Sequence, residues 1–116
     1  MNRVFIYATL KSKSVLEKAL GTNHGKVMVP TIAHGYKETF IHHNHDVWPT
    51  LWTTGSRVST KGDIINVTDD ELAKLRAWEN NYVLRPVQTE DGQALAFFFE
   101  PVRKVPMASV IRWRNR

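Results

Sequence analysis

The chain of 116 residues contains no cysteine. Disulfide bonds, thiolate metal sites and cysteine nucleophiles are therefore excluded, and this composition fits a reducing compartment. The sequence also lacks an apolar run near the roughly 20 residues that a membrane-spanning helix needs. Residues 1–10 lack the long apolar core and small-residue cleavage site of a signal peptide. We therefore expect a cytoplasmic protein with no membrane partner.

The excess of positive charge is confined to one end of the chain. There are 16 Lys and Arg residues against 11 Asp and Glu. Five of the basic residues and none of the acidic ones lie in residues 103–116, so the remainder carries 11 of each sign. A chain of this length is most simply one domain. We expect a domain over residues 1–102 and a basic C-terminal tail over residues 103–116.

The tail allows two interpretations. Arginine side chains that alternate with an aromatic ring could bind the phosphates and bases of a nucleic acid. The apolar residues of the same segment instead favour docking of the tail on the domain, and this is the interpretation we prefer. The residues that would contact a nucleic acid are Arg112, Arg114 and Arg116.

Local patterns predict an α+β domain with a small, mostly antiparallel β-sheet or barrel and two short helices. The helices are predicted after two capping-box patterns, one at Ser14–Glu17 and one at Thr68–Glu71. Gly21 is expected to end the first helix, and Asn80 and Asn81 to end the second in the left-handed conformation. Strands are expected over residues 3–7, 26–33, 36–41, 62–67, 82–89 and 93–100, with a loop-rich stretch over residues 42–54.

The second predicted helix carries an acid where an apolar residue is expected. Leu72, Leu75 and Glu79 recur at spacings of three and four, which places them on nearly the same helix face. The Glu79 carboxylate would then either reach water at the rim of the core or lie inside. Burial would raise its pKa toward neutrality, as a catalytic acid or base requires.

Four segments in chain order resemble the γ-glutamylcyclotransferase-like family, which is also called AIG2-like or BtrG-like. Residues 4–11 (VFIYATLK) are similar to the family's "vYGTLk", and residues 48–51 (WPTL) to "yPal". Residues 62–72 (GDIINVTDDEL) are similar to "GevyevtdeeL". Residues 75–79 (LRAWE), with Tyr82 and Arg85 following, are similar to "LDxxEg..Y.R".

The resemblance implies a fold, a reaction and a site. Glu79 would be the catalytic acid/base of an enzyme that cyclises a γ-glutamyl amine or peptide to 5-oxoproline. Such an enzyme is a cyclotransferase, classed with transferases or lyases, that needs no metal or other cofactor. Its partner would be a small γ-glutamyl substrate, held by backbone N–H groups of the loop at residues 7–10. The substrate-binding residues that the resemblance implies are Tyr7, Ala8, Thr9, Leu10, Pro49, Tyr82 and Arg85.

Three positions depart from the family pattern. Ala8 stands where the family has a glycine, so a positive φ or a close backbone approach at this position would distort or narrow the pocket. Arg76 replaces an aspartate, and Asn80 replaces the glycine that follows the catalytic glutamate. These changes leave a second function open, that of a catalytically inactive module that binds a small molecule or a protein in the same pocket. A third is a nucleic-acid-binding accessory protein that acts through the basic tail.

A histidine-rich stretch at residues 42–46 (HHNHD) suggests two further possibilities. Imidazole side chains suit Zn²⁺, Cu²⁺ or Ni²⁺, but further ligands would have to come from distant residues. A solvated loop explains the same stretch without a metal, and we prefer that interpretation.

Overall fold

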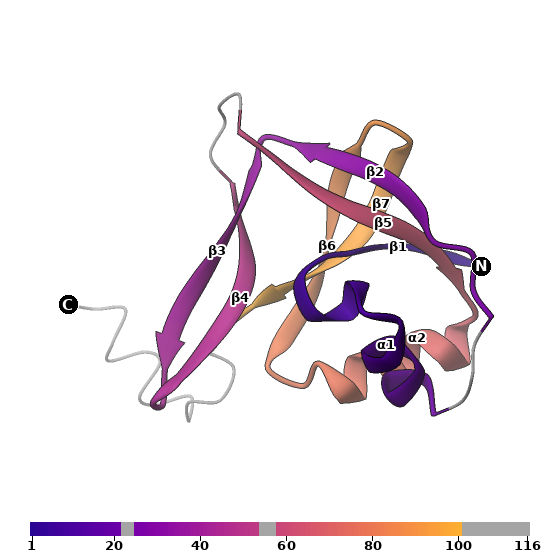
Figure 1. The fold of residues 1–116 in the computed structure, drawn as a ribbon, viewed down its shortest axis with the longest axis horizontal. Coiled ribbons are helices and arrows are strands. Elements are labelled where there is room, and N and C mark those ends of the chain that lie inside the picture. The colour runs from indigo at the N-terminus through magenta and orange to yellow at the C-terminus, as the bar shows by residue number, and fades with distance from the viewer. Residues whose placement is uncertain (22–24, 54–57, 101–116) are drawn as a thin grey trace.

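A computed structural model describes residues 1–21, 25–53 and 58–100 of the chain. The first strand is followed by a helical segment, four consecutive strands, a second helix and two final strands (Figure 1). The helical elements are η1 (Ala8–Lys11, a 3-10 turn), α1 (Lys13–Leu20) and α2 (Asp69–Trp78). The strands are β1 (Asn2–Ile6), β2 (Val29–His34), β3 (Tyr36–His43), β4 (Asp46–Thr53), β5 (Ser59–Val67), β6 (Tyr82–Thr89) and β7 (Gly92–Phe99).

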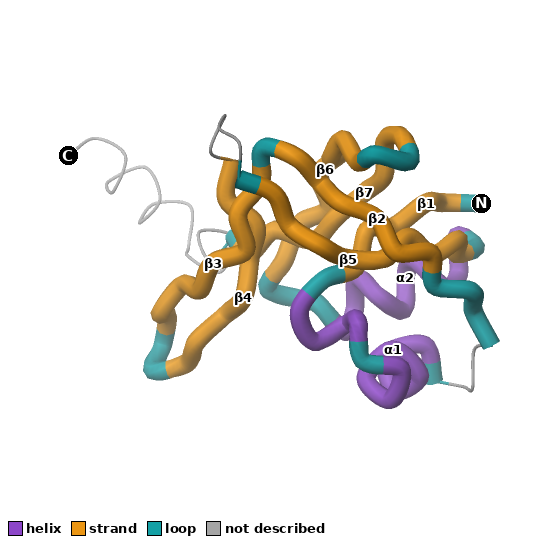
Figure 2. The backbone as a smooth tube through the Cα atoms, turned by 45° about the horizontal axis from the view of Figure 1, so that its top comes forward, coloured by secondary structure: helices purple, strands orange, loops and turns teal. Residues whose placement is uncertain are grey.

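Strands β1, β5, β2, β6 and β7 form a closed barrel in that order. Its neighbouring strands are antiparallel except where β1 meets β7 in parallel, at Val4 and Leu95. Helices α1 and α2 lie together on one side of the barrel (Figure 2). The predicted α+β class with a mostly antiparallel sheet is confirmed.

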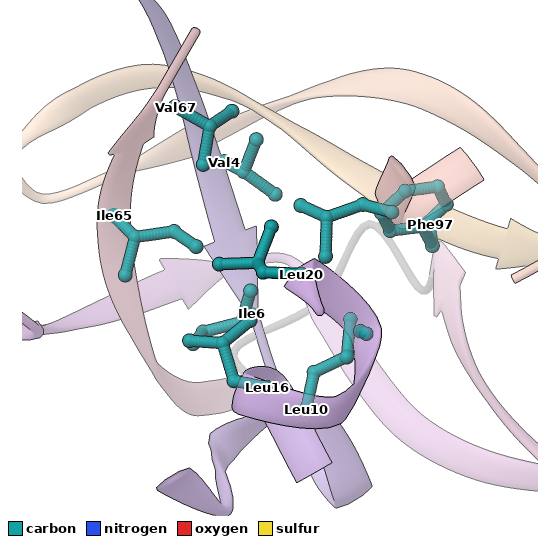
Figure 3. Close-up of a cluster of buried hydrophobic side chains, with 10 residues drawn as sticks. Val4, Ile6, Leu10, Leu16, Leu20, Ile65, Val67 and Phe97 are labelled. Carbon is teal, nitrogen blue, oxygen red and sulfur yellow. The ribbon is translucent and has the colours of Figure 1, made fainter. Parts of the chain in front are cut away.

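Strand β1 is buried on both faces. Val4 and Ile6 pack toward the helices with Leu16 and Leu20 of α1, and Figure 3 shows this cluster. Phe5 and Tyr7 point the other way and pack with Leu51, Ala33 and Val87. Successive side chains of a strand point to opposite faces, so four consecutive β-branched and aromatic residues, Val4 to Tyr7, supply both cores. The last of them, Tyr7, directly follows β1 and lies beside the site described below.

A glycine in β5 allows β1 and β5 to approach closely. A Cβ atom at Gly62 would lie 2.5 Å from the Ile6 carbonyl oxygen and 2.6 Å from the Phe5 ring. No side chain fits at these distances, so this position of the GDIINV segment requires glycine. The close approach helps to fix the C-terminal end of β1, from which the loop at residues 7–10 departs.

The stretch predicted as loop-rich, residues 42–54, instead contains, over its described residues 42–53, the turn and the second strand of a β-hairpin. Strand β3 continues to His43 and pairs with β4 from His43–Asp46 to Tyr36–Thr53, in a separate two-stranded sheet. The turn residues Asn44 and His45 have φ of 52° and 66°. Two consecutive residues at positive φ are typical of a type I′ turn, which favours Asn at the first position but usually has Gly at the second. The hairpin stands at one side of the barrel (Figure 1).

The helix boundaries confirm some of the predicted end signals and contradict others. At α2 the Thr68 hydroxyl accepts from the Glu71 N–H at 3.1 Å, and the Glu71 carboxylate accepts from the Thr68 N–H at 2.9 Å. Gly21 ends α1 at φ 76°, as predicted. The predicted capping box at Ser14 is wrong because α1 already begins at Lys13 after Ser12. The predicted left-handed stop is also wrong, since Asn80 and Asn81 do not have positive φ. Among the described residues, no helix is long and apolar enough to span a membrane.

Candidate active site

A small cavity of about 20 Å³ lies where β1, η1, the end of α2 and the hairpin meet. It gathers residues from four segments that are far apart in the sequence. Seven of the eight lining residues are among the site residues expected from the sequence, and Phe97 is the other. The lining residues are Tyr7, Ala8, Thr9, Leu10, Pro49, Glu79, Tyr82 and Phe97.

Glu79 reaches the cavity from the end of α2. Its backbone N–H donates to the Leu75 carbonyl at 2.8 Å, and the fully buried Leu75 side chain anchors this last turn in the core. The Glu79 side chain is partly buried, and burial raises its pKa from 4.5 to about 7. Throughout residues 1–21, 25–53 and 58–100, no group donates a hydrogen bond or forms an ion pair with its carboxylate. Glu79 is thus an unpaired carboxyl group that can take or give a proton near neutral pH.

Two tyrosines form the walls on either side of Glu79. The Tyr82 hydroxyl donates to the Pro49 carbonyl at 2.8 Å, and the Tyr82 N–H donates to the Glu79 carbonyl at 3.0 Å. The Tyr7 hydroxyl donates to the Phe97 carbonyl. Burial raises the pKa of both phenols, and the negative charge of Glu79 raises it further. Both tyrosines therefore stay neutral near pH 7 and act as hydrogen-bond donors and walls, while Glu79 is the group that titrates.

The loop after β1 supplies backbone amides to the cavity. Residues 8–11 form the 3-10 turn η1, and its first N–H groups, those of Ala8 and Thr9, precede the hydrogen bonds of the turn. Ala8 has φ 53°. This is the left-handed region that favours glycine, so the position where the family pattern has glycine is indeed one of positive φ. Here an alanine occupies it, and this residue lines the cavity.

Arg85, also expected as a substrate-binding residue, lies outside this cavity. Its Nη2 atom pairs with Glu100 Oε2 at 2.6 Å, on the surface. Both residues line a larger cavity of about 450 Å³ between the hairpin and the ends of β6 and β7. That cavity is bigger, but its one acid is neutralised by Arg85, whereas the small cavity holds the unpaired acid with the raised pKa. We therefore take the small cavity as the candidate active site.

The histidine-rich stretch does not gather ligands in the described part of the chain. No group of three or more His, Asp or Glu side chains lies within reach of one metal ion there. His43 instead packs edge-on against Phe99, with ring centroids 5.7 Å apart, and His45 occupies the hairpin turn. The basic tail with Arg112, Arg114 and Arg116 lies outside the described residues.

Sequence patterns did not identify Phe97 as part of the site. It belongs to the three consecutive phenylalanines of β7, which indicate only a buried strand. Its carbonyl accepts the hydrogen bond from the Tyr7 hydroxyl, and the residue lines the cavity. Only the pairing of β7 beside β1 brings it to the site, and no local signal encodes that pairing.

Comparison with known proteins identifies the family of this chain. The family model described as "Gamma-glutamyl cyclotransferase, AIG2-like" matches residues 4–114. The chain belongs to this family. No curated protein matches it in sequence.

Solved structures show the same γ-glutamyl cyclotransferase-like fold. An Arabidopsis thaliana protein superposes with a TM-score of 0.68 at 20% identity, covering 98% of this chain and 73% of that one. An uncharacterized protein of Pyrococcus horikoshii gives 0.64 at 19% identity, covering 85% and 78%. A structure titled "Gamma-glutamyl cyclotransferase" gives 0.65 at 9% identity, covering 97% and 86%.

Proposed function

We propose that the protein is a γ-glutamylcyclotransferase-like enzyme that converts a γ-glutamyl amine or peptide to 5-oxoproline and releases the amine. The observation that carries the proposal is Glu79, an unpaired and partly buried carboxyl group whose pKa is about 7, in a cavity that also contains loop amides. Family membership supports the reaction class. The specific substrate and the role of Glu79 are the proposal.

The reaction needs a group that moves protons, and Glu79 has the right properties. The substrate's α-ammonium group binds beside the Glu79 carboxylate, which removes one proton. The freed amine attacks the γ-carbonyl carbon, a ring of five atoms closes, and the bond from that carbon to the leaving nitrogen breaks. Over the whole reaction the ammonium nitrogen loses two protons and the leaving nitrogen gains two, and Glu79 carries them one at a time. No external nucleophile is required because the attack is intramolecular.

The loop amides would stabilise the negative charge of the substrate and of the transition state. The N–H groups of Ala8 and Thr9 have no partner within the turn and belong to residues that line the cavity, so we expect them to donate to the γ-carbonyl oxygen as charge develops there. The neutral Tyr7 and Tyr82 exclude water around the reacting atoms. No metal or cofactor enters this scheme.

The cavity must widen to admit a substrate. A volume of about 20 Å³ accommodates one or two water molecules, and a γ-glutamyl group is several times larger. The Pro49 wall is the one that can move most easily, because the hairpin that carries it pairs with no barrel strand within the described ranges. The hydrogen bond from Tyr82 to the Pro49 carbonyl is the contact that such a movement would stretch.

The test is turnover of a panel of γ-glutamyl amines and peptides, with 5-oxoproline measured by mass spectrometry. The wild-type protein should release 5-oxoproline from at least one compound, and Glu79→Gln should lower the rate by about 100-fold or more, the usual contribution of a general acid–base group. Glu90→Gln, a matched change at the opposite end of β6, should have no effect. Undiminished product with Glu79→Gln would refute the role of Glu79. Thermal stabilisation by a γ-glutamyl compound without any turnover would instead identify a binding module.

A further inference from the structure

A second acid lies on the side of the hairpin that faces the cavity. Residues directly opposite each other in an antiparallel pair share one face, with Cβ atoms about 5 Å apart. Phe40 pairs with Pro49, which lines the cavity, and Glu38 pairs with Leu51. Leu51 is buried and packs with Tyr7, another lining residue. Glu38 therefore lies beside the cavity, next to the wall that Pro49 forms.

The Glu38 carboxylate has no partner that neutralises it. It takes part in no ion pair or side-chain hydrogen bond with the residues that the structure describes. The eight residues that line the cavity include no Lys, Arg or His. Two unpaired carboxylates, those of Glu38 and Glu79, thus lie in or beside the same cavity, and no basic residue among the eight that line it neutralises them.

The charge of Glu38 is felt inside the cavity. Burial is the main cause that raises the pKa of Tyr7, and the negative charge of Glu38 adds to it by less than the charges of Tyr82 and Glu79 do. This effect agrees with the strand register, which places Glu38 across from the residue that packs on Tyr7. Glu38 is also half-buried, so its field is less screened than that of an acid in open solvent.

We propose that Glu38 selects γ-glutamyl amines whose leaving amine carries a second positive charge, such as a diamine. The inference rests on the proposed function. Glu79 is engaged by the α-ammonium group of the γ-glutamyl part, which leaves Glu38 for the cation at the other end of the molecule. The exposed ring of Phe40, opposite Pro49 on the same face, offers an apolar surface for the alkyl chain between the two nitrogens.

The experiment compares two substrates of equal length. One is the γ-glutamyl monoamide of diaminobutane, and the other is the γ-glutamyl amide of pentylamine, in which a methyl group replaces the terminal ammonium. We expect wild-type kcat/KM to favour the diaminobutane compound by about five- to tenfold, as suits a partly exposed charge pair. Glu38→Gln should remove this preference by lowering kcat/KM for the diaminobutane compound, and Glu38→Lys should reverse it. Glu90→Gln, which removes an acid far from the cavity, should retain it.

A preference that persists in Glu38→Gln, or wild-type protein without a preference, would overturn the role of Glu38 while leaving the proposed function intact. If no compound of the γ-glutamyl panel, these two included, is turned over, the proposed function fails, and binding decides the role of Glu38 separately. Calorimetric titration of Glu79→Gln with each compound should then show tighter binding of the diaminobutane compound. That difference should disappear in the double variant with Glu38→Gln. Equal binding of the two compounds, or binding of neither, would overturn the proposal.

Discussion

The fold stabilises the protonated form of Glu79. Burial raises the pKa of this carboxyl group from 4.5 to about 7, so between these pH values the folded chain keeps a proton that the unfolded chain has lost. The contribution of Glu79 to the free energy of unfolding therefore falls as pH rises through this window and is constant above it. Any catalytic carboxyl group that must ionise at neutral pH lowers the free energy of unfolding in this way when it is partly removed from water.

Glu79→Gln should consequently stabilise the protein in a pH-dependent manner. At pH 4 the two proteins should differ little, because the carboxyl group is protonated in the folded state. At pH 8 the variant should be more stable by about 1–3 kcal/mol, a range that allows for the partial exposure of the side chain. Urea denaturation of both proteins across this range measures the difference. A difference that does not change with pH would contradict the burial of Glu79.

Ala8, which lines the cavity, has a strained backbone conformation. Its φ of 53° costs an L-residue about 1–2 kcal/mol relative to the right-handed regions, and strained backbone often accompanies functional sites. We expect Ala8→Gly to raise the free energy of unfolding by about 0.5 kcal/mol, since relief of this strain exceeds the extra flexibility of glycine in the unfolded chain. Ala33→Gly, in the buried part of β2, should instead destabilise the protein. Thermal denaturation distinguishes the two signs, and destabilisation by Ala8→Gly would show that its methyl group contributes essential packing.

At the level of elements, the sequence predicted those parts of the fold that have local signals. Helix α2 has a complete capping box, and the β6–β7 hairpin has alternation around Asp91–Gly92. The β3–β4 hairpin was missed because its turn lacks glycine. His45 adopts positive φ at the second turn position, where glycine is the usual signal of a hairpin. The surrounding histidines favoured the prediction of a loop.

The candidate site could be predicted only in part, for a related reason. Periodicity placed Glu79 on the inward face of α2, and the resemblance brought together the loop at residues 7–10, Pro49 and Tyr82. The parallel closure of β1 on β7 brings Phe97 to the cavity, and the register of β3 on β4 places Glu38 beside it. These are long-range pairings, and alternation along one strand does not reveal its neighbour.

For the molecule as a whole, the main question is how the hairpin is held on the barrel. In the described part of the chain the two sheets share no strand pairing. They meet through packing and side-chain contacts. The Trp48 ring stacks on Phe99 with centroids 5.1 Å apart, and the buried Thr50 hydroxyl accepts from the Phe99 N–H at 2.9 Å. Because Pro49 lies between these two residues, the same contacts position the movable wall of the candidate site.

Thr50→Val should therefore loosen the hairpin more than the barrel. Valine has a similar shape but cannot accept the hydrogen bond, so the buried Phe99 N–H would be left without a partner at a cost of about 1–3 kcal/mol. Hydrogen exchange measured by mass spectrometry should show faster exchange in β3 and β4 than in wild type, with β1 and β5 unchanged under native conditions. Thr39→Val, directly opposite Thr50 on β3, is the matched control and should cost less than about 0.5 kcal/mol. Equal effects of the two variants would mean that packing alone holds the hairpin. Uniformly faster exchange throughout Thr50→Val would mean that the hairpin and barrel open as one unit, and that the cavity cannot widen through the hairpin.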